Sequence, residues 1–180
     1  MTLRQAQGDR GEVVWEGRFI TAVRDGRWEF VRRACNIRAV VILAETDAGE
    51  VVLIEQHRVP IGRRCLELPA GLIGDDDGAE DDTVEAAAAR ELVEETGYRP
   101  ERVERLGDFY SSPGMVAEGF TLVRASGLTR VGDGGGTDGE NIIVHRVRRD
   151  AIADFVAAKR REGVGIDVRL LLLLGADYSG

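Results

Sequence analysis

Residues 87–97 read Ala-Ala-Ala-Arg-Glu-Leu-Val-Glu-Glu-Thr-Gly, and no other stretch says as much about the fold of this chain. At about 100° per residue, Glu91, Glu94 and Glu95 fall within roughly a 100° arc of one helix face. The opposite face is apolar and carries Ala86, Ala89, Leu92 and Val93. The stretch therefore predicts a helix with one face in the core and three carboxylates on the other.

The three carboxylates act against helix stability. Like charges three and four positions apart cost about 0.2–0.5 kcal/mol per pair, and the C-terminal end of a helix disfavours anions. A sequence that keeps them there is typical of a set of oxygen ligands for a hard cation such as Mg²⁺. The alternative interpretation is a solvated acidic face in which Arg90 pairs with Glu94.

The ends of this helix have local signals. Asp82 is expected as the N-cap, with Glu85 three positions on in a variant of the capping box, and Gly97 as the stop. An acidic stretch at 75–82 precedes the helix.

The rest of the chain reads mostly as strands, because β-branched and aromatic runs alternate with turn residues. A hairpin is expected at 19–23 and 28–32 around Asp25-Gly26, then strands at 36–44, 51–55, 65–68, 103–109, 120–124 and 142–147. Helices are expected at 150–161 and 167–174, and the loop 132–139 is too rich in glycine to hold a fixed shape alone. The fold class is therefore α+β, a mixed sheet between helices on its two faces (α/β/α).

Composition narrows the class of protein. A net charge of −8 argues against nonspecific binding to nucleic acid or an anionic membrane. The chain shows no apolar leader, and the run Leu170–Leu174 is too short to span a bilayer. Cys35 and Cys65 fit neither a disulfide framework nor a zinc site, so buried, reduced thiols and a cytoplasmic location are expected. His57 and His145 have no partner at metal-site spacing.

A longer pattern surrounds the acidic helix. Glu67-Leu68-Pro69-Ala70-Gly71, a loop, and then residues 87–97 together resemble the Nudix box and its preceding strand. The second half of the box matches at every fixed position, namely Arg90, Glu91, Leu92, Glu94, Glu95 and Gly97. In the first half Asp82 stands where the family has Glu, and the loop is about five residues longer, so either Asp82 or Glu80 would replace that Glu.

Four further segments are similar to the ADP-ribose and ADP-sugar pyrophosphatase subgroup of the Nudix hydrolases. They are Trp28–Arg33, Ile54–Arg58, Ser111–Gly114 and Gly139–Val144. The resemblance implies an N-terminal β extension at 1–35 that contributes to a homodimer, and a Nudix domain at 36–180. Alternation along the strand directs Trp28 and Arg33 to opposite faces, so one straight strand could not easily bring both side chains into one substrate pocket. A bulge, or a strand lying across a subunit boundary with each face in a different site, would allow both to bind substrate.

The resemblance also implies the roles of individual residues. The metal ligands would be Ala70 through its carbonyl, Glu91, Glu94 and Glu95, for Mg²⁺ with Mn²⁺ as an alternative. Glu140 would be the catalytic base, with Asp138 as the next candidate, assisted by Glu94 and Arg90. The substrate-binding residues would be Trp28, Glu29, Arg33, Arg58, Gly71, Leu72 and Pro113.

The expected activity is hydrolysis of the pyrophosphate bond of ADP-ribose or a related ADP-sugar, giving AMP and a sugar phosphate. The alternatives are another nucleoside diphosphate derivative, such as GDP-mannose or an oxidised nucleotide, or a nucleotide-binding protein without turnover. Such non-catalytic relatives usually lack one of the box carboxylates, whereas all three are present here.

Overall fold

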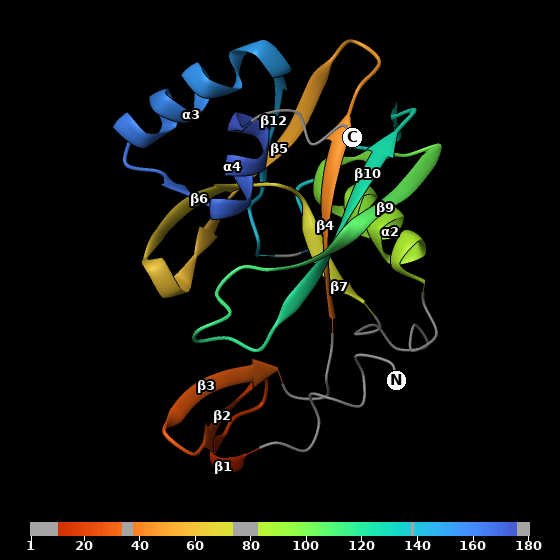
Figure 1. The fold of residues 1–180 in the computed structure, drawn as a ribbon. Coiled ribbons are helices and arrows are strands. Elements are labelled where there is room, and N and C mark those ends of the chain that lie inside the picture. The colour runs from red at the N-terminus through yellow and green to blue at the C-terminus, as the bar shows by residue number, and fades with distance from the viewer. Residues whose placement is uncertain (1–10, 34–37, 74–82, 138, 176–180) are drawn as a thin grey trace.

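The computed structural model describes residues 11–33, 38–73, 83–137 and 139–175. Its centre is an eight-stranded mixed sheet in the order β13-β6-β5-β4-β10-β9, with β12 paired to β5 and β7 paired to β4. Helix α2 packs on one face of this sheet, and helices α3 and α4 cover the other (Figure 1). The expected α/β/α architecture is confirmed.

The strands are β1 (Glu12–Glu16), β2 (Ile20–Asp25), β3 (Trp28–Arg33), β4 (Arg38–Glu45), β5 (Glu50–Arg58), β6 (Arg63–Glu67), β7 (Ala70–Ile73), β8 (Tyr98–Arg99), β9 (Arg102–Tyr110), β10 (Gly119–Ser126), β11 (Thr129–Arg130), β12 (Ile143–Arg148) and β13 (Gly165–Ile166). The helices are α2 (Val84–Thr96), α3 (Ile152–Arg161) and α4 (Leu171–Leu174), with 3₁₀ turns η2 (Val59–Ile61), η3 (Arg149–Ala151) and η4 (Val168–Leu170).

Alternation along β4 builds the core on both faces of the sheet. Val41 joins a cluster with Leu53 under α3, while Val40 and Ile42 join a second cluster with Leu92 of α2. All five of these side chains are fully buried.

Helix α2 buries Ala87, Ala88 and Leu92, whereas Ala86 of the predicted apolar face is exposed and Ala89 and Val93 are only half-buried. The predicted core face is therefore right at Leu92 and wrong at Ala86, because the buried face is rotated toward Glu95, which is itself buried.

Most of the expected elements are present with shifted ends. The short strands β7, β8, β11 and β13 were not expected, because two to four residues carry too little pattern to identify a strand. Helix α2 begins later than predicted. The predicted N-cap at Asp82 is wrong, because the N-cap is Thr83, whose hydroxyl accepts a hydrogen bond from the Ala86 amide at 3.1 Å; Asp82 itself lies outside the described residues. Gly97 is the C-terminal stop as predicted, with φ 74°.

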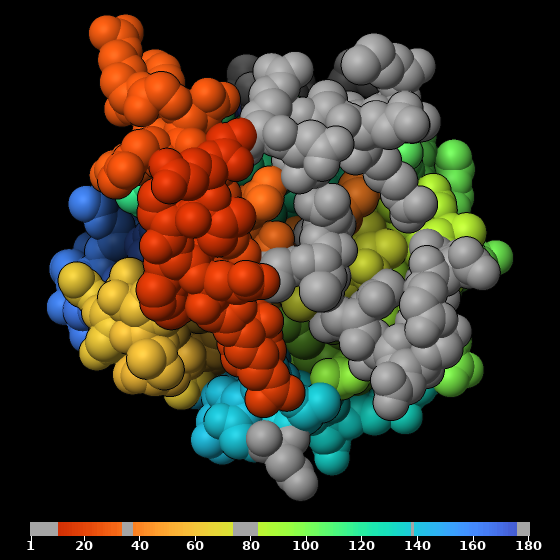
Figure 2. Space-filling model, turned by 90° about the horizontal axis from the view of Figure 1, so that it is seen from below, coloured from red at the N-terminus to blue at the C-terminus, as the bar shows by residue number. Residues whose placement is uncertain are grey.

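The first three strands form a sheet of their own. The predicted turn at Asp25-Gly26 is present, and Gly26 supplies its positive φ of 59°. The outer edge of β3 pairs with the segment after β9, because Val31 donates to the Met115 carbonyl and accepts from the Ala117 amide at 2.9 and 2.8 Å. Figure 2 views the molecule from this end and shows the sheet lying across it.

In the part of the chain that the structure describes, every helix is too short or too polar to cross a membrane.

Candidate active site

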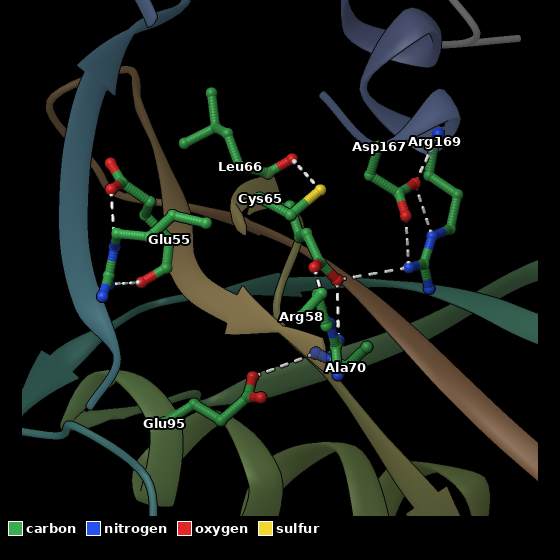
Figure 3. A network of polar contacts seen from close by, with 10 residues as sticks. Glu55, Arg58, Cys65, Leu66, Ala70, Glu95, Asp167 and Arg169 are labelled. Atoms are coloured by element: carbon green, nitrogen blue, oxygen red, sulfur yellow. Dashed lines mark hydrogen bonds and ion pairs between the residues drawn. The ribbon is translucent and has the colours of Figure 1, made fainter. Parts of the chain in front are cut away.

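Helix α2 lies so close to β7 that its carboxylates touch the strand backbone. A Cβ atom on Gly71 would fall 1.9 Å from the carboxyl carbon of Glu91, so only glycine allows this approach. One turn further, Glu95 Oε2 accepts a hydrogen bond from the Ala70 amide at 3.0 Å. Figure 3 shows the Glu95 carboxylate directed from the helix toward Ala70. The predicted ligands Ala70, Glu91 and Glu95 are therefore brought together.

Glu95 lies in an environment that disfavours its charge. Its side chain is buried, and burial together with the nearby carboxylates of Glu91 and Glu140 raises the pKa of Glu95 to about 8. The Ala70 amide and the Arg58 guanidinium act in the opposite direction and only partly compensate. Three acidic groups thus share one region, with Arg58 near Glu95 and Arg90 beside Glu91, and carboxylate oxygens are the donors that a divalent cation prefers.

The other two acidic-helix residues lie at the margin of this region. A terminal nitrogen of Arg90 lies 3.8 Å from the Glu91 carboxylate. Glu94 is exposed. Among residues 11–33, 38–73, 83–137 and 139–175, no three His, Cys, Asp or Glu side chains form a ready-made metal cluster. The residues nevertheless fit a hard cation, since every donor in the region is an oxygen.

The glycine loop is clasped onto the end of helix α2. Gly135 and Gly136 donate their amides to the carbonyls of Glu95 and Glu94, at 2.9 and 3.1 Å, so the loop satisfies carbonyls that the helix end leaves unpaired. A Cβ on Gly134 would lie 2.4 Å from the Thr96 carbonyl carbon. These glycines thus permit close packing, and the loop takes its shape from the helix rather than from its own sequence.

Glu140 lies four residues after Gly136, the last glycine that bonds to the end of helix α2. Its amide donates to the Thr137 carbonyl at 3.2 Å, and its Oε2 accepts from the Thr137 amide at 2.9 Å. The Ile142 amide donates back to the Gly135 carbonyl at 3.2 Å. Glu140 is exposed, yet its charge is close enough to act on Glu95. Glu140 therefore lies in the same region as Glu95, with its carboxylate beside Gly136, which bonds to the end of helix α2.

Arg58 lies beside the acidic cluster but already has a partner. Its Nε and one terminal nitrogen donate to the two oxygens of buried Glu67, both at 2.7 Å. Arg169 approaches the same carboxylate at 3.4 Å and pairs with Asp167 at 2.6 Å (Figure 3). A diphosphate would meet the remaining terminal nitrogen of Arg58 or would have to displace Glu67.

Four predicted substrate residues lie on the strands and turn near the N-terminal sheet. Arg33 pairs with Glu118 of the same chain, and Glu29 pairs with Arg24 at 3.0 Å. Trp28 keeps 59% of its surface exposed, and Pro113 lies in the exposed turn next to the segment that β3 pairs with. Leu72 stands apart from these, on β7 opposite Ala39.

Several predictions concern residues beyond the described ones, namely Cys35, Glu80, Asp82, Asp138 and the acidic stretch 75–82. The second cysteine is buried, and burial with the neighbouring Glu67 carboxylate raises the pKa of Cys65 to about 12, so its thiol stays protonated. The predicted burial of this thiol is therefore confirmed.

Sequence reasoning did not identify Asp167, Arg169 or Arg64 as part of the site. Arg169 reaches Glu67 from the far end of the chain and pairs with Asp167, and Arg64 on β6 donates to the Asn141 carbonyl. No local pattern indicates the contacts of Arg169 with Glu67 and of Arg64 with Asn141, because these partners are distant in sequence.

The sequence matches the NUDIX domain family over residues 36–163. An ADP-ribose pyrophosphatase of Bacillus subtilis is 41% identical over 80 residues, covering 44% of this chain and 40% of that protein. A GDP-mannose pyrophosphatase of Cronobacter sakazakii is 34% identical over 145 residues, covering 76% and 70%. The crystal structure of an ADP compounds hydrolase has a TM-score of 0.65 at 23% identity, over 91% of this chain and 88% of that one. The chain spans under two thirds of the length of several curated relatives that it matches.

Proposed function

Since the chain belongs to the Nudix hydrolase family and is related to ADP-ribose and GDP-mannose pyrophosphatases, we propose that it hydrolyses the pyrophosphate bond of ADP-ribose or a related ADP-sugar. The products would be AMP and a sugar phosphate, and the reaction would depend on Mg²⁺, with Mn²⁺ as a substitute. The resemblance of the sequence to the Nudix box is confirmed by this membership.

One observation carries the proposal. The Glu91 and Glu95 carboxylates both lie against the backbone of β7, at Gly71 and Ala70, and the charge of Glu140 contributes to raising the pKa of Glu95. Such a set of carboxylates, weakly compensated by Arg58, supports a divalent cation held by Glu91, Glu95 and the Ala70 carbonyl, with Glu94 assisting. When bound, such a cation would neutralise phosphate charge and make a bound water more acidic.

The remaining roles belong to side chains of this chain. Glu140 would accept the proton of the attacking water at its carboxylate, and its position next to the clasped loop favours this role. Arg90 would orient Glu91. Arg58 and Arg33 would bind diphosphate oxygens, for which the arginine fork is suited. Holding the diphosphate and neutralising its charge is most of what such a transfer requires.

The adenine and sugar would contact Trp28, Glu29 and Pro113 near the N-terminal sheet, and Gly71 and Leu72 on β7. We propose that residues 1–35 act in a homodimer, because Val13, Trp15, Phe19 and Trp28 keep 45%, 56%, 68% and 59% of their surface exposed. Apolar exposure concentrated on one small sheet is typical of an interaction surface.

A second candidate substrate is GDP-mannose. The GDP-mannose pyrophosphatase of Cronobacter sakazakii matches a larger share of this chain, 76%, than the ADP-ribose pyrophosphatase does, 44%. The two substrates share the diphosphate and differ in base and sugar, so the cluster on α2 serves either one.

A substrate panel separates these candidates. ADP-ribose, other ADP-sugars, GDP-mannose and an oxidised nucleotide would be incubated with enzyme and Mg²⁺, with and without EDTA, while AMP and GMP are quantified. We expect AMP from ADP-ribose with the highest kcat/KM, and loss of turnover in EDTA. GMP release from GDP-mannose at a higher kcat/KM would make GDP-mannose the preferred substrate. Full turnover in EDTA would refute the proposed dependence on Mg²⁺.

A further inference from the structure

Arg64 on β6 bonds both to the buried carboxylate of Glu55 on β5 and to the backbone next to Glu140. Its Nε donates to Glu55 Oε1 at 2.7 Å, and its terminal nitrogen NH2 donates both to the Glu55 carbonyl and, at 3.0 Å, to the carbonyl of Asn141. Asn141 is the residue that follows Glu140. One guanidinium thus joins three points on two chain segments.

The strand register explains why this contact is available. Glu55 on β5 is opposite Leu66 of β6 on one side and Ile143 of β12 on the other. Arg64 and Asn141 each precede those partners by two residues, so they lie level with each other across β5. Strands on the two sides of a central strand are about 9.6 Å apart, twice the ordinary spacing. Only a long side chain that crosses β5 can link them.

Glu55 provides a fixed end for this link. It is 4% exposed, and its Oε2 lies 3.1 Å from both His145 Nε2 and Lys159 Nζ. Burial acts to raise the pKa of Glu55, but hydrogen bonds from Lys159, Arg64 and His145 outweigh it and the pKa is lowered. The carboxylate is therefore ionised and held from β6, β12 and α3 together.

Asn141, which Arg64 bonds at its other end, has a backbone conformation that requires stabilising contacts. Asn141 has φ 50°, and it is the one non-glycine residue of the described chain with a positive φ. This backbone conformation is sparsely populated and persists where neighbouring contacts hold it. On the N-terminal side the glycine loop is clasped to α2, so the Arg64 bond to Asn141 supplies the second anchor of the segment that carries Glu140.

We propose that Arg64 is a positioning residue that fixes the direction of Glu140 by holding the Asn141 carbonyl against Glu55. The inference rests on the proposed role of Glu140 as the base. Arginine is required because its fork reaches Glu55 and Asn141 at once, whereas a lysine nitrogen is a single point with no fixed fork.

The test uses Arg64→Gln and Arg64→Lys, with Arg146→Gln as the matched control. Arg146 lies on β12 itself, is exposed, and contacts Glu50 at 3.8 Å rather than the loop. We expect both Arg64 variants to lower kcat about 10- to 100-fold with KM within a few-fold, since a misplacement of about 1 Å can cost 100-fold. Arg64→Lys keeps a cation next to Glu55, so it tests the anchor even if Arg64→Gln folds poorly.

Two further readouts separate positioning from general destabilisation. Hydrogen exchange of the Ile142 amide should accelerate in both Arg64 variants and not in Arg146→Gln. In a Glu140→Gln background, Arg64→Lys should cause no further loss of kcat. Unchanged exchange, unchanged kcat, or an equal loss in both backgrounds would overturn the inference.

Glu140→Gln alone tests the proposed function separately. A large loss of kcat in Glu140→Gln, combined with normal kcat in Arg64→Lys, would refute the positioning role of Arg64 and support Glu140 as the base. Wild-type kcat in Glu140→Gln removes the base, and Arg64 then has no catalytic group to position.

Discussion

Replacing Gly134 with alanine tests whether the glycine loop is positioned by helix α2. A Cβ at this position would lie 2.4 Å from the Thr96 carbonyl carbon and 2.7 Å from both the Glu95 oxygen and the Gly97 nitrogen. All three are backbone atoms of the helix end, which cannot rotate away as a side chain could. Ordinary contact begins near 3.4 Å, so the loop must retreat by about 1 Å, the scale at which misplacement costs about 100-fold in rate.

The cost in stability can be worked from the same contacts. Gly134 has φ 69°, a conformation that costs alanine about 1–2 kcal/mol. Retreat of the loop also weakens the two hydrogen bonds from Gly135 and Gly136 to the helix carbonyls, each of which contributes about 0.5–1.5 kcal/mol. We expect the free energy of unfolding to fall by about 2–5 kcal/mol, and kcat to fall by about 100-fold.

The measurement combines thermal unfolding with steady-state kinetics on ADP-ribose. Gly132→Ala is the matched control, because its Cβ would meet nothing within 4 Å and its φ is not positive. It should behave as wild type in both assays. If Gly134→Ala also keeps wild-type melting and kcat, the loop is not clasped to the helix and the reasoning fails.

Four other predictions concern the cluster, the base, the N-terminal sheet and the C-terminal ion pair. Glu95→Gln should lower kcat at least about 100-fold at modest Mg²⁺, since weaker losses at metal sites already cost about 10–100-fold; its melting without Mg²⁺ should not fall, and full turnover would contradict the ligand role. Glu140→Gln should lower kcat strongly with KM within a few-fold, and a raised KM at constant kcat would make it a binding residue. The protein should be a homodimer by light scattering, and Trp28→Ala should raise KM about 5- to 100-fold if the indole stacks on adenine; a fully active monomer would argue against both. Asp167→Asn should lower the melting temperature at pH 7, because pairing with Arg169 outweighs burial and lowers the pKa of Asp167; this advantage exists above the ordinary pKa of 3.8 and is lost as pH falls through the lowered value, so a difference that persists at lower pH would refute it.

The features that could be predicted from the sequence are those with local signals. Helix α2 shows its acidic and apolar faces within about four turns, and Gly97 marks its end. The β2–β3 hairpin is identified by its turn pair, and the longer strands by their β-branched residues. Strand β7 could not be predicted, because four residues after a proline carry no periodic pattern and its pairing with β4 comes from distant chain.

The glycine loop shows where local reasoning gave only half of the answer. Its composition predicts that it cannot hold a shape alone, and the structure agrees, since helix α2 supplies the shape. Composition does not reveal that the same lack of side chains lets the loop reach within hydrogen-bonding distance of the helix carbonyls. Glycine therefore serves close approach here, at Gly134 as at Gly71, rather than freedom of movement.

The arginines near the proposed diphosphate site also have partners that the sequence alone does not reveal. A guanidinium near a proposed diphosphate site predicts a phosphate contact, yet Arg58 is paired to Glu67 and Arg33 to Glu118. Carboxylates so placed hold each fork in one orientation, and a bound diphosphate would then compete with a partner already in position. The buried Glu67 and Glu55 are the residues that explain this arrangement, because each one is a charge that could not stay buried without its arginine. Arg58 and Arg64 are thus held in the same way, each by a buried glutamate, and they differ in what else the guanidinium approaches: Arg58 lies near Glu95, and Arg64 donates to the Asn141 carbonyl.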